Sequence, residues 1–516
     1  MPHLHWLDIA VLVLYFIGIA ALTIKATKRN QTADDYFVAG RSMPAWAVAM
    51  AMMAALISSN TLVGHPATAY QKGLILLLGS LTLPLVLLFV ARVIVPFYRN
   101  VVGMSAYEYL GARFGMGGRL YASTCFIGDR LFDVGVTMLT TAVPICVMTG
   151  WGLQTVILWM AVFTVAYTMI GGMEAVVWTS VAQGLVFVAA AFVIIARLIF
   201  APECGPTGAV IGAAWDAGKF SLGDFSFSWA SLFDAGVTTQ WLLLVAYTAN
   251  WARRYIADQH MVQRYLIAKS DAEASRGALW NGLLCVPVWG IFMFIGVLLY
   301  GYYQLSGATP PASSDEVVPH FILNHLPSGV IGLMLAAILA ASMSSISPDL
   351  NSIATAFTAD IVGHFKPGLA DRDRLRCGRF SVALFGLLAI GVALVMAPKG
   401  GGATIMERAV TVAAILSGGM LGLFFLGFFT RRATRQGCYA GLTACAIFTA
   451  WGTLTSGKEP MVNLGLNFPL NPIFIGLVGH LIVFGVGYAW SRAFGGYVPA
   501  DIDRLTYRKT PASPVS

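Results

Sequence analysis

Long apolar stretches recur along the whole chain, separated by short segments that hold most of the polar and charged residues. A helix needs about 20 apolar residues to cross the hydrocarbon core of a bilayer, and counting such stretches predicts about 13 spans. The alternating ten-residue pattern of a membrane barrel is absent, so the fold class predicted is an all-α integral membrane protein. Numbered in chain order, the spans begin near Ile9, Met43, Leu74, Leu120, Leu153, Ala175, Val237, Ala278, Val330, Phe380, Ala409, Gly437 and Pro472.

No long polar block interrupts these stretches, which predicts one membrane domain over residues 1–498 and a short cytoplasmic tail over 499–516. The first residues lack the basic segment and small-residue cleavage site of a secretory signal, so we expect the first span to remain in the mature protein. The tail is too short for a soluble catalytic domain, and the sequence shows no enzyme motif in a plausible context. We therefore expect no enzyme activity.

Composition supports the membrane interpretation and excludes other classes. Hydrophobic residues make up 58% of the chain and charged residues 11%, a balance that a water-surrounded surface could not carry. The net charge of +8 comes from short basic clusters between spans, so we expect a lipid bilayer around the chain and no nucleic acid partner. The seven cysteines are scattered, which predicts neither a disulfide framework nor a zinc site.

The basic clusters predict the orientation, because loops rich in Lys and Arg stay in the cytoplasm. The segments 201–235 and 306–328 on the opposite side are poor in these residues. We therefore expect a multi-pass protein of the cell inner membrane. Its N-terminus should lie outside and its C-terminus in the cytoplasm. The basic clusters fall within 25–41, 92–119, 264–276, 372–379, 431–435 and 492–509.

Polar or small residues interrupt three spans at a depth where a simple anchor would stay apolar. Span two contains ISSNTLVGHP, span seven contains YTANWARRYIADQ, and span nine contains AASMSSISPDLNS. Such residues are tolerated inside a membrane where they line a cavity or are buried against other helices. The three spans are therefore the candidates for a binding site.

Four segments resemble the sodium:solute symporter family: DDYFVAGRSMPAW, YTMIGGMEAVVWTSVAQ, ADQHMVQRYLIAK and SMSSISPDLNSIATAFTADI. The resemblance implies a LeuT-type 5+5 inverted repeat, roughly 43–200 and 237–430, with a peripheral first helix and two additional C-terminal helices. It also implies that spans two and seven are broken near the midplane, and that the chain imports a small polar solute by alternating access.

The resemblance places a sodium site between spans two and nine. Ala341, Ser344 and Ser345 have i, i+3, i+4 spacing, which puts them on one helix face. Sodium needs oxygen ligands, and hydroxyls or carbonyls of an unwound helix supply them. The carbonyls of Ala54 and Ile57 match the remaining family ligands. Alternatively, small residues on span nine only allow close helix packing.

Some family members bind a second sodium through an acidic residue at the start of span six. Here Ser180 stands at that position, and Pro348 follows Ser347 where another hydroxyl would help. We therefore expect one sodium ion in each transport cycle.

Solute contacts in the family begin just beyond the sodium carbonyls of span two, at positions matched here by Ser58, Asn60 and Thr61. Alternatively, these residues are solvated in an unwound turn. A histidine follows them at position 65, and we expect it to serve packing or gating rather than proton transfer.

Charged residues also lie inside spans four and seven, where ionisable groups are costly. One hypothesis is that an arginine binds a carboxylate of the solute through two hydrogen bonds. The alternative is internal pairing, Arg130 with Asp133 and Arg254 with Asp258, at helical spacing. The candidates carried forward are Arg130, Asp133, Arg253 and Arg254.

Together these features predict a sodium-coupled symporter for a sugar, a sugar acid or another carboxylate. Two other functions remain open, a transporter-like membrane sensor and a proton-coupled symporter of the same fold. We expect a monomer or a weak homo-oligomer.

Overall fold

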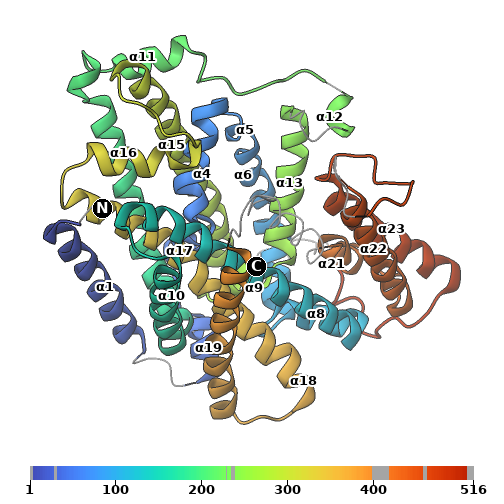
Figure 1. Cartoon of the computed structure of the whole chain (residues 1–516). Helices are drawn as coiled ribbons and strands as arrows, with labels where there is room; N and C mark the ends of the chain where they lie inside the picture. Colours follow the sequence, from blue (N-terminus) through green and yellow to red (C-terminus); the bar gives the residue numbers. More distant parts are fainter. Residues whose placement is uncertain are drawn as a thin grey trace, which may run out of the picture.

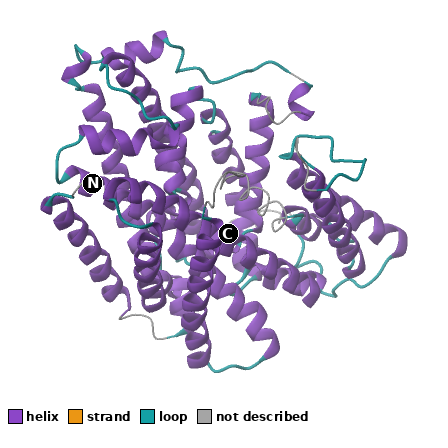
Figure 2. Cartoon of the chain, viewed as in Figure 1, coloured by secondary structure: helices purple, strands orange, loops and turns teal. Residues whose placement is uncertain are grey.

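The computed structural model describes residues 4–27, 32–227, 229–233, 239–397, 418–456 and 462–507. Within these residues the chain consists of helices and connecting loops without a strand, as Figure 2 shows. In the first half the helices are α1 (Trp6–Thr27), α2 (Ala33–Val38), η1 (Ala39–Arg41), α3 (Ala45–Leu56), α4 (Ser59–Lys72), α5 (Leu77–Ser80), α6 (Thr82–Phe89), η2 (Val90–Ile94), α7 (Val95–Val101), α8 (Ala106–Phe114), α9 (Met116–Thr149), α10 (Leu153–Ile199), η3 (Pro202–Cys204), α11 (Ala209–Asp216) and α12 (Ala230–Phe233).

The second half repeats the pattern of long helices joined by short ones. Its helices are α13 (Gln240–Ala257), α14 (Gln259–Leu266), α15 (Asp271–Leu305), η4 (Ser314–Glu316), α16 (Val317–His325), α17 (Val330–Ala356), η5 (Phe357–Val362), α18 (Gly363–Phe365), α19 (Asp371–Met396), α21 (Met420–Phe429), α22 (Arg435–Thr455) and α23 (Phe474–Phe494).

Among the described residues, nine helices are long and apolar enough to cross a membrane, or ten if α3 and α4 form one bent span. The predicted start of span seven at Val237 and that of span eleven at Ala409 lie outside the described residues. The all-helical membrane fold is therefore confirmed, whereas the number of 13 spans stays a prediction.

α10 joins two predicted spans, five and six, in one continuous element. Gly172 lies inside it with φ 57° and ψ −160°, so the helix bends there. Side chains disfavour this backbone conformation, whereas glycine adopts it readily. The glycine pair in YTMIGGMEAVV thus marks the turn between the two spans.

The interior of the bundle is formed by α3, α4, α9, α10, α15 and α17. In Figure 1, α1 lies at one edge of the molecule, and α22 and α23 lie side by side at the opposite edge. α17 packs against α9 and α10, while α3 and α4 pack against α15. α17 is thus central, and polar residues along it reach the interior rather than lipid.

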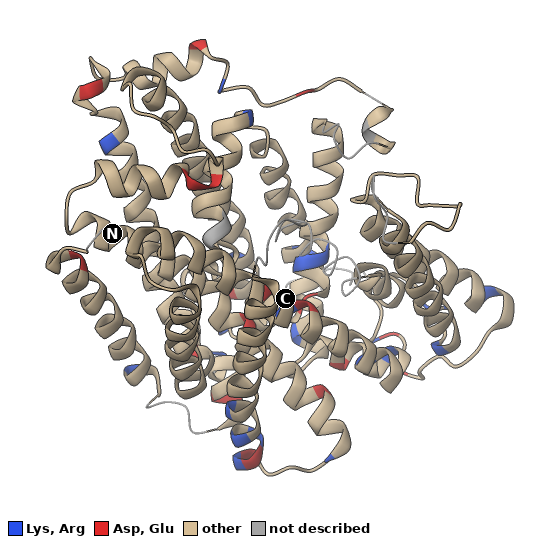
Figure 3. Ribbon diagram, viewed as in Figure 1, with Lys and Arg blue, Asp and Glu red and all other residues tan. Residues whose placement is uncertain are grey.

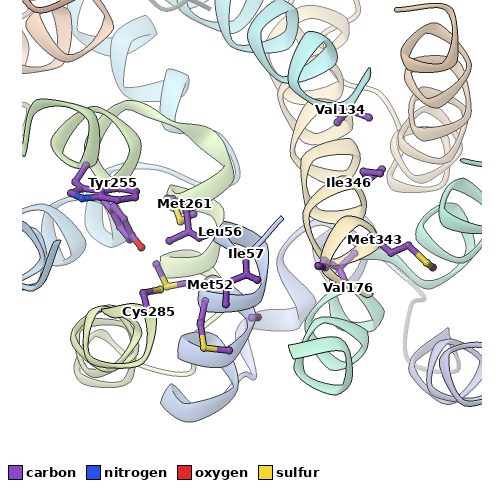
Figure 4. Packing of buried hydrophobic residues seen from close by; sticks show 14 of the residues in the cluster. Met52, Leu56, Ile57, Val134, Val176, Tyr255, Met261, Cys285, Met343 and Ile346 are labelled. Carbon is purple, nitrogen blue, oxygen red and sulfur yellow. The ribbon is translucent and has the colours of Figure 1, made fainter. Parts of the chain in front are cut away.

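Apolar side chains fix the helix break in span two. Figure 4 shows Met52, Leu56 and Ile57 of this region facing Met261 and Cys285 of neighbouring helices. All of these side chains are less than 10% exposed, and Leu56 has the highest value, 8%. This packing holds the unwound segment in place, so its carbonyl groups have defined directions.

Candidate functional site

Span two is broken where α3 ends. Ile57 has ψ 101° and Ser58 has φ −104° and ψ 179°, so both are extended before α4 begins at Ser59. The axes on the two sides of the break differ by 61°. A helix end leaves carbonyl groups without intrahelical partners. The carbonyls of Ala54 and Ile57 are therefore available to a neighbouring element.

That neighbouring element is α17. The Ser344 hydroxyl donates to the carbonyl oxygen of Ala54 at 2.9 Å and lies 3.1 Å from that of Ala341. The Ser345 hydroxyl lies 3.2 Å from the carbonyl oxygen of Ile57 and 3.3 Å from that of Ala341. The structure thus brings together all five residues that the sequence predicts for the sodium site.

The carbonyl oxygen of Ala55 joins the same group, 3.2 Å from the Ser345 hydroxyl, although the sequence did not indicate it. A hydroxyl carries one hydrogen, so Ser344 and Ser345 cannot donate to all the carbonyl oxygens around them at once. Ser345 is 6% exposed and Ser344 2%. The result is a buried cluster of uncharged oxygens with more acceptors than donors.

A cavity of about 340 Å³ lies beside this cluster, and Ser345 belongs to both. Ser58, Thr61 and His65 line it from the broken span. The other residues that line it are Ala55, Leu56, Ser80, Arg130, Asp133, Val136, Thr137, Thr140, Tyr247, Asn250, Trp251, Arg254, His260, Trp289 and Asp349. Of the predicted solute contacts, Arg253 lies outside this lining, and the side chain of Asn60 lies outside the described part of the structure.

Arg130 is the centre of a charged network at one side of the cavity. Its guanidinium donates to Asp129 at 2.7 Å and to Asp133 at 2.8 Å. Asp258 and Asp349 each lie 3.9 Å from it. Arg130 is 4% exposed. Carboxylates from α9, from α17 and from the break before α14 thus surround one buried cation, and the predicted pair of Arg130 with Asp133 is confirmed.

The second internal pair, Arg254 with Asp258, is wrong. α13 ends at Ala257, and Asp258 is extended with ψ 120°, where its carboxylate accepts from the N–H of His260 at 3.0 Å. Helical i, i+4 spacing therefore no longer applies between the two residues. Arg254 instead faces Asp133 of α9, with 3.7 Å between Nη2 and Oδ2.

His260 and Asp349 form a buried contact that the sequence did not predict. Asp349 lies on α17 one turn beyond Ser345. His260 lies in the first turn of α14, so the contact joins span seven to span nine. A signal was present in the sequence, since Asp349 is an acid inside an apolar span, but its partner is 89 positions away.

The residues at the position of a second family sodium site are buried. Ser180 is 0% exposed and Ser347 1%, and neither hydroxyl has a hydrogen-bond partner among the described residues. No carboxylate was predicted there, and the expectation of one sodium in each cycle stays a prediction.

Comparison with known proteins agrees with this architecture. A family model described as sodium:solute symporter family matches residues 36–444. The sodium/sialic acid symporter NanT of Aliivibrio fischeri is 30% identical, over 98% of this chain and 96% of its own.

Two solved structures are also similar. A Na⁺-coupled sialic acid symporter in a substrate-bound outward-open state has a TM-score of 0.85 at 28% identity, covering 95% of this chain and 98% of its own. Mhp1, a nucleobase-cation-symport-1 family transporter in a closed conformation, has a TM-score of 0.60 at 16% identity, covering 92% and 99%. The second likeness shows the fold alone.

These similarities confirm the predicted fold class and agree with a transport function. The family consists of membrane transporters, and the oxygen cluster and cavity lie where a broken span meets α17. The chain belongs to the sodium:solute symporter family, and it is a sodium-coupled symporter of a small polar organic solute.

Proposed function

We propose that this chain imports a sugar acid or a related carboxylate together with sodium across the cell inner membrane by alternating access. The observation that carries the proposal is the meeting of Ser344 and Ser345 with the free carbonyls of span two. The sialic acid symporters among its relatives support the choice of a sugar acid. The membrane potential contributes about 2.3 kcal/mol for each sodium charge per 100 mV.

Sodium fits the oxygen cluster because it is a hard cation and the cluster offers hard oxygen ligands. Carbonyl and hydroxyl oxygens are hard ligands, and the cluster contains no sulfur or imidazole. We assign the ion to Ala54, Ile57, Ala341, Ser344 and Ser345. A bound ion would satisfy the carbonyl oxygens that two hydroxyl hydrogens cannot, and would tie span two to α17.

Coupling follows from the position of Ser345, which faces both the oxygen cluster and the cavity. An ion that fixes the break in span two also fixes Ser58 and Thr61 on the cavity wall. Sodium and solute would therefore stabilise the same conformation, so each raises the affinity for the other by the same factor.

The inverted repeats over 43–200 and 237–430, the outside N-terminus, the cytoplasmic C-terminus and the stoichiometry of one sodium belong to the same proposal. The breaks after Leu56 and before Gln259, one in each proposed repeat, support the repeat assignment. Figure 3 supports an uneven charge distribution, with Lys and Arg gathered at the end of the bundle where α19 begins.

The sodium site is tested by measuring solute uptake into vesicles reconstituted with the Ser345→Ala protein. Loss of one hydroxyl ligand should raise the sodium concentration for half-maximal uptake by about tenfold to a hundredfold, since a hydrogen bond or ligand to a charge is worth about 1.5–3 kcal/mol. The matched control is Ser342→Ala on the same helix, because the Ser342 hydroxyl contacts Met160 instead of span two. Equal effects of the two variants would contradict the assignment.

Proton coupling is the second candidate, and the buried contact between His260 and Asp349 on the cavity wall favours it. An imposed proton gradient without sodium separates the two functions. Uptake under that condition would establish proton coupling, whereas uptake only under a sodium gradient would support sodium.

A further inference from the structure

We propose that Arg254 and Asp133, which lie side by side in the lining of the solute cavity, select an acidic and polyhydroxylated solute. In this scheme Arg254 binds the carboxylate of the solute, Asp133 accepts hydrogen bonds from its hydroxyls, and the solute replaces the contact between the two side chains. The inference rests on the proposed function and deepens it by naming the residues that recognise charge.

Arg254 is the cavity arginine whose donors are available. Its guanidinium makes no hydrogen bond to any described residue, and its closest carboxylate oxygen, on Asp133, is 3.7 Å away. Its side chain is 24% exposed, against 5% for Arg130. Arg130 already donates to two carboxylates, so an anionic solute would have to displace one of them. An anion can bind Arg254 without that loss.

Asp133 has one oxygen committed and one available. Its Oδ2 accepts from Arg130 at 2.8 Å and is also the atom nearest to Arg254. Its Oδ1 has no hydrogen bond to the described part of the chain, and the side chain is 41% exposed. Arg130 continues to balance the charge of Asp133 when Arg254 moves away. Asp133 can therefore accept hydrogen bonds from solute hydroxyls.

Closure of the cavity makes a carboxylate necessary. While the cavity is open, water solvates the donors of Arg254, but an occluded state removes that water. An unpaired buried cation is costly, and a carboxylate matches the planar guanidinium with two charge-assisted hydrogen bonds. A neutral sugar of the same size would leave the cation poorly satisfied, so the cavity should close less readily around it.

The remaining cavity wall suits a sugar ring. Tyr247, Trp251 and Arg254 lie on one face of α13 at i, i+4, i+7, and Trp251 stacks on Trp289 of α15 with ring centroids 5.1 Å apart. The indole N–H of Trp251 has no hydrogen-bond partner among the described residues. Aromatic faces pack on the apolar side of a ring while polar tips serve its edge. The solute class is thus a cyclic or extended sugar acid.

Thermal unfolding of the full-length protein in sodium buffer tests the pair. The acidic probes are sialic acid, galacturonate and gluconate, and their neutral counterparts are sialic acid methyl ester, galactose and glucitol. A ligand that binds the folded state raises the melting temperature. The wild type should be stabilised by at least one acid at a lower concentration than by its neutral counterpart.

Arg254→Gln should raise the half-saturating concentration of that acid by about tenfold or more and remove the preference over the neutral counterpart. Arg253→Gln, one position away and outside the cavity lining, should change it less than about twofold. Asp133→Asn should weaken the acid and its neutral counterpart to a similar extent, because both carry the hydroxyls.

Sodium alone distinguishes failure of this inference from failure of the proposed function. If sodium stabilises neither the wild type nor Arg254→Gln, the proposed function is contradicted. If sodium stabilises both, each is folded with its ion site intact. In that case, preference of the wild type for neutral sugars, response to no probe, or equal effects of Arg254→Gln and Arg253→Gln would overturn the inference.

Discussion

The oxygen cluster at the break in span two and the charged network around Arg130 lie close together but use different chemistry. Ser345 and Asp349 stand one turn apart on α17, one in each region. The oxygen cluster consists of uncharged groups from two elements, whereas the network pairs arginines and aspartates of α9, α13, α17 and the break before α14. The first has acceptors in excess, whereas the second pairs its charges with one another.

Because of this difference, each region is suited to a different ligand. A cluster with excess acceptors is completed by a cation, so its contacts should strengthen when sodium binds. A network whose charges are already paired has little to gain from a further charge unless one of its members is loosely held. On the cavity wall Arg254 is such a member, because it makes only a 3.7 Å contact to Asp133. The two regions should therefore respond to mutation in different ways.

The largest effect is expected from removing the centre of the charged network. Arg130→Gln leaves buried carboxylates without their shared cation, which should lower the free energy of unfolding by about 3–5 kcal/mol. Denaturation of the purified protein measures this loss in the free energy of unfolding. Arg253→Gln is the control, since Arg253 makes only a 3.6 Å contact to Asp129 and should cost far less. A stable Arg130→Gln protein would show that the buried carboxylates do not depend on this residue.

An intermediate effect is expected on the linkage between the two ligands. Sodium should raise the affinity for the solute by a factor of about 5–150, the range typical of coupled sites. Ser345→Ala should reduce this factor towards one, whereas Ser342→Ala should leave it unchanged. Binding of a labelled sugar acid at several sodium concentrations measures the factor. Unaltered linkage in Ser345→Ala would mean that the two regions communicate by another route.

The smallest effect concerns stability without any ligand. Ser344 and Arg254 share no hydrogen-bond partner among the described residues. The changes in unfolding free energy caused by Ser344→Ala and by Arg254→Gln should therefore add to within about 0.5 kcal/mol in the double variant. Strong non-additivity in sodium-free buffer would show that the two regions are one structural unit.

The same two regions differ in how well the sequence predicts them. The sodium site follows from local patterns, because i, i+3, i+4 spacing fixes which residues of α17 share a face and the polar interruption marks the break in span two. The five predicted residues indeed meet. The assignment of these five residues as ligands of the sodium ion stays a proposal.

The charged network was harder to predict, because its pairs join different helices. The same i, i+4 rule that paired Arg254 with Asp258 assumes a continuous helix, but the chain unwinds at Asp258. Asp258 then caps the N-terminus of α14, and Arg254 contacts Asp133 of another span. Sequence spacing contains no information on which distant helix will lie opposite, so the contact of His260 with Asp349 was also missed.

The most direct measurement is an experimental structure of the protein in sodium and, separately, in choline. We expect density for a single ion in contact with the oxygens of Ala54, Ile57, Ala341, Ser344 and Ser345 in sodium, and none there in choline. Density for the ion elsewhere, or these oxygens directed away from one another in the sodium form, would contradict this expectation.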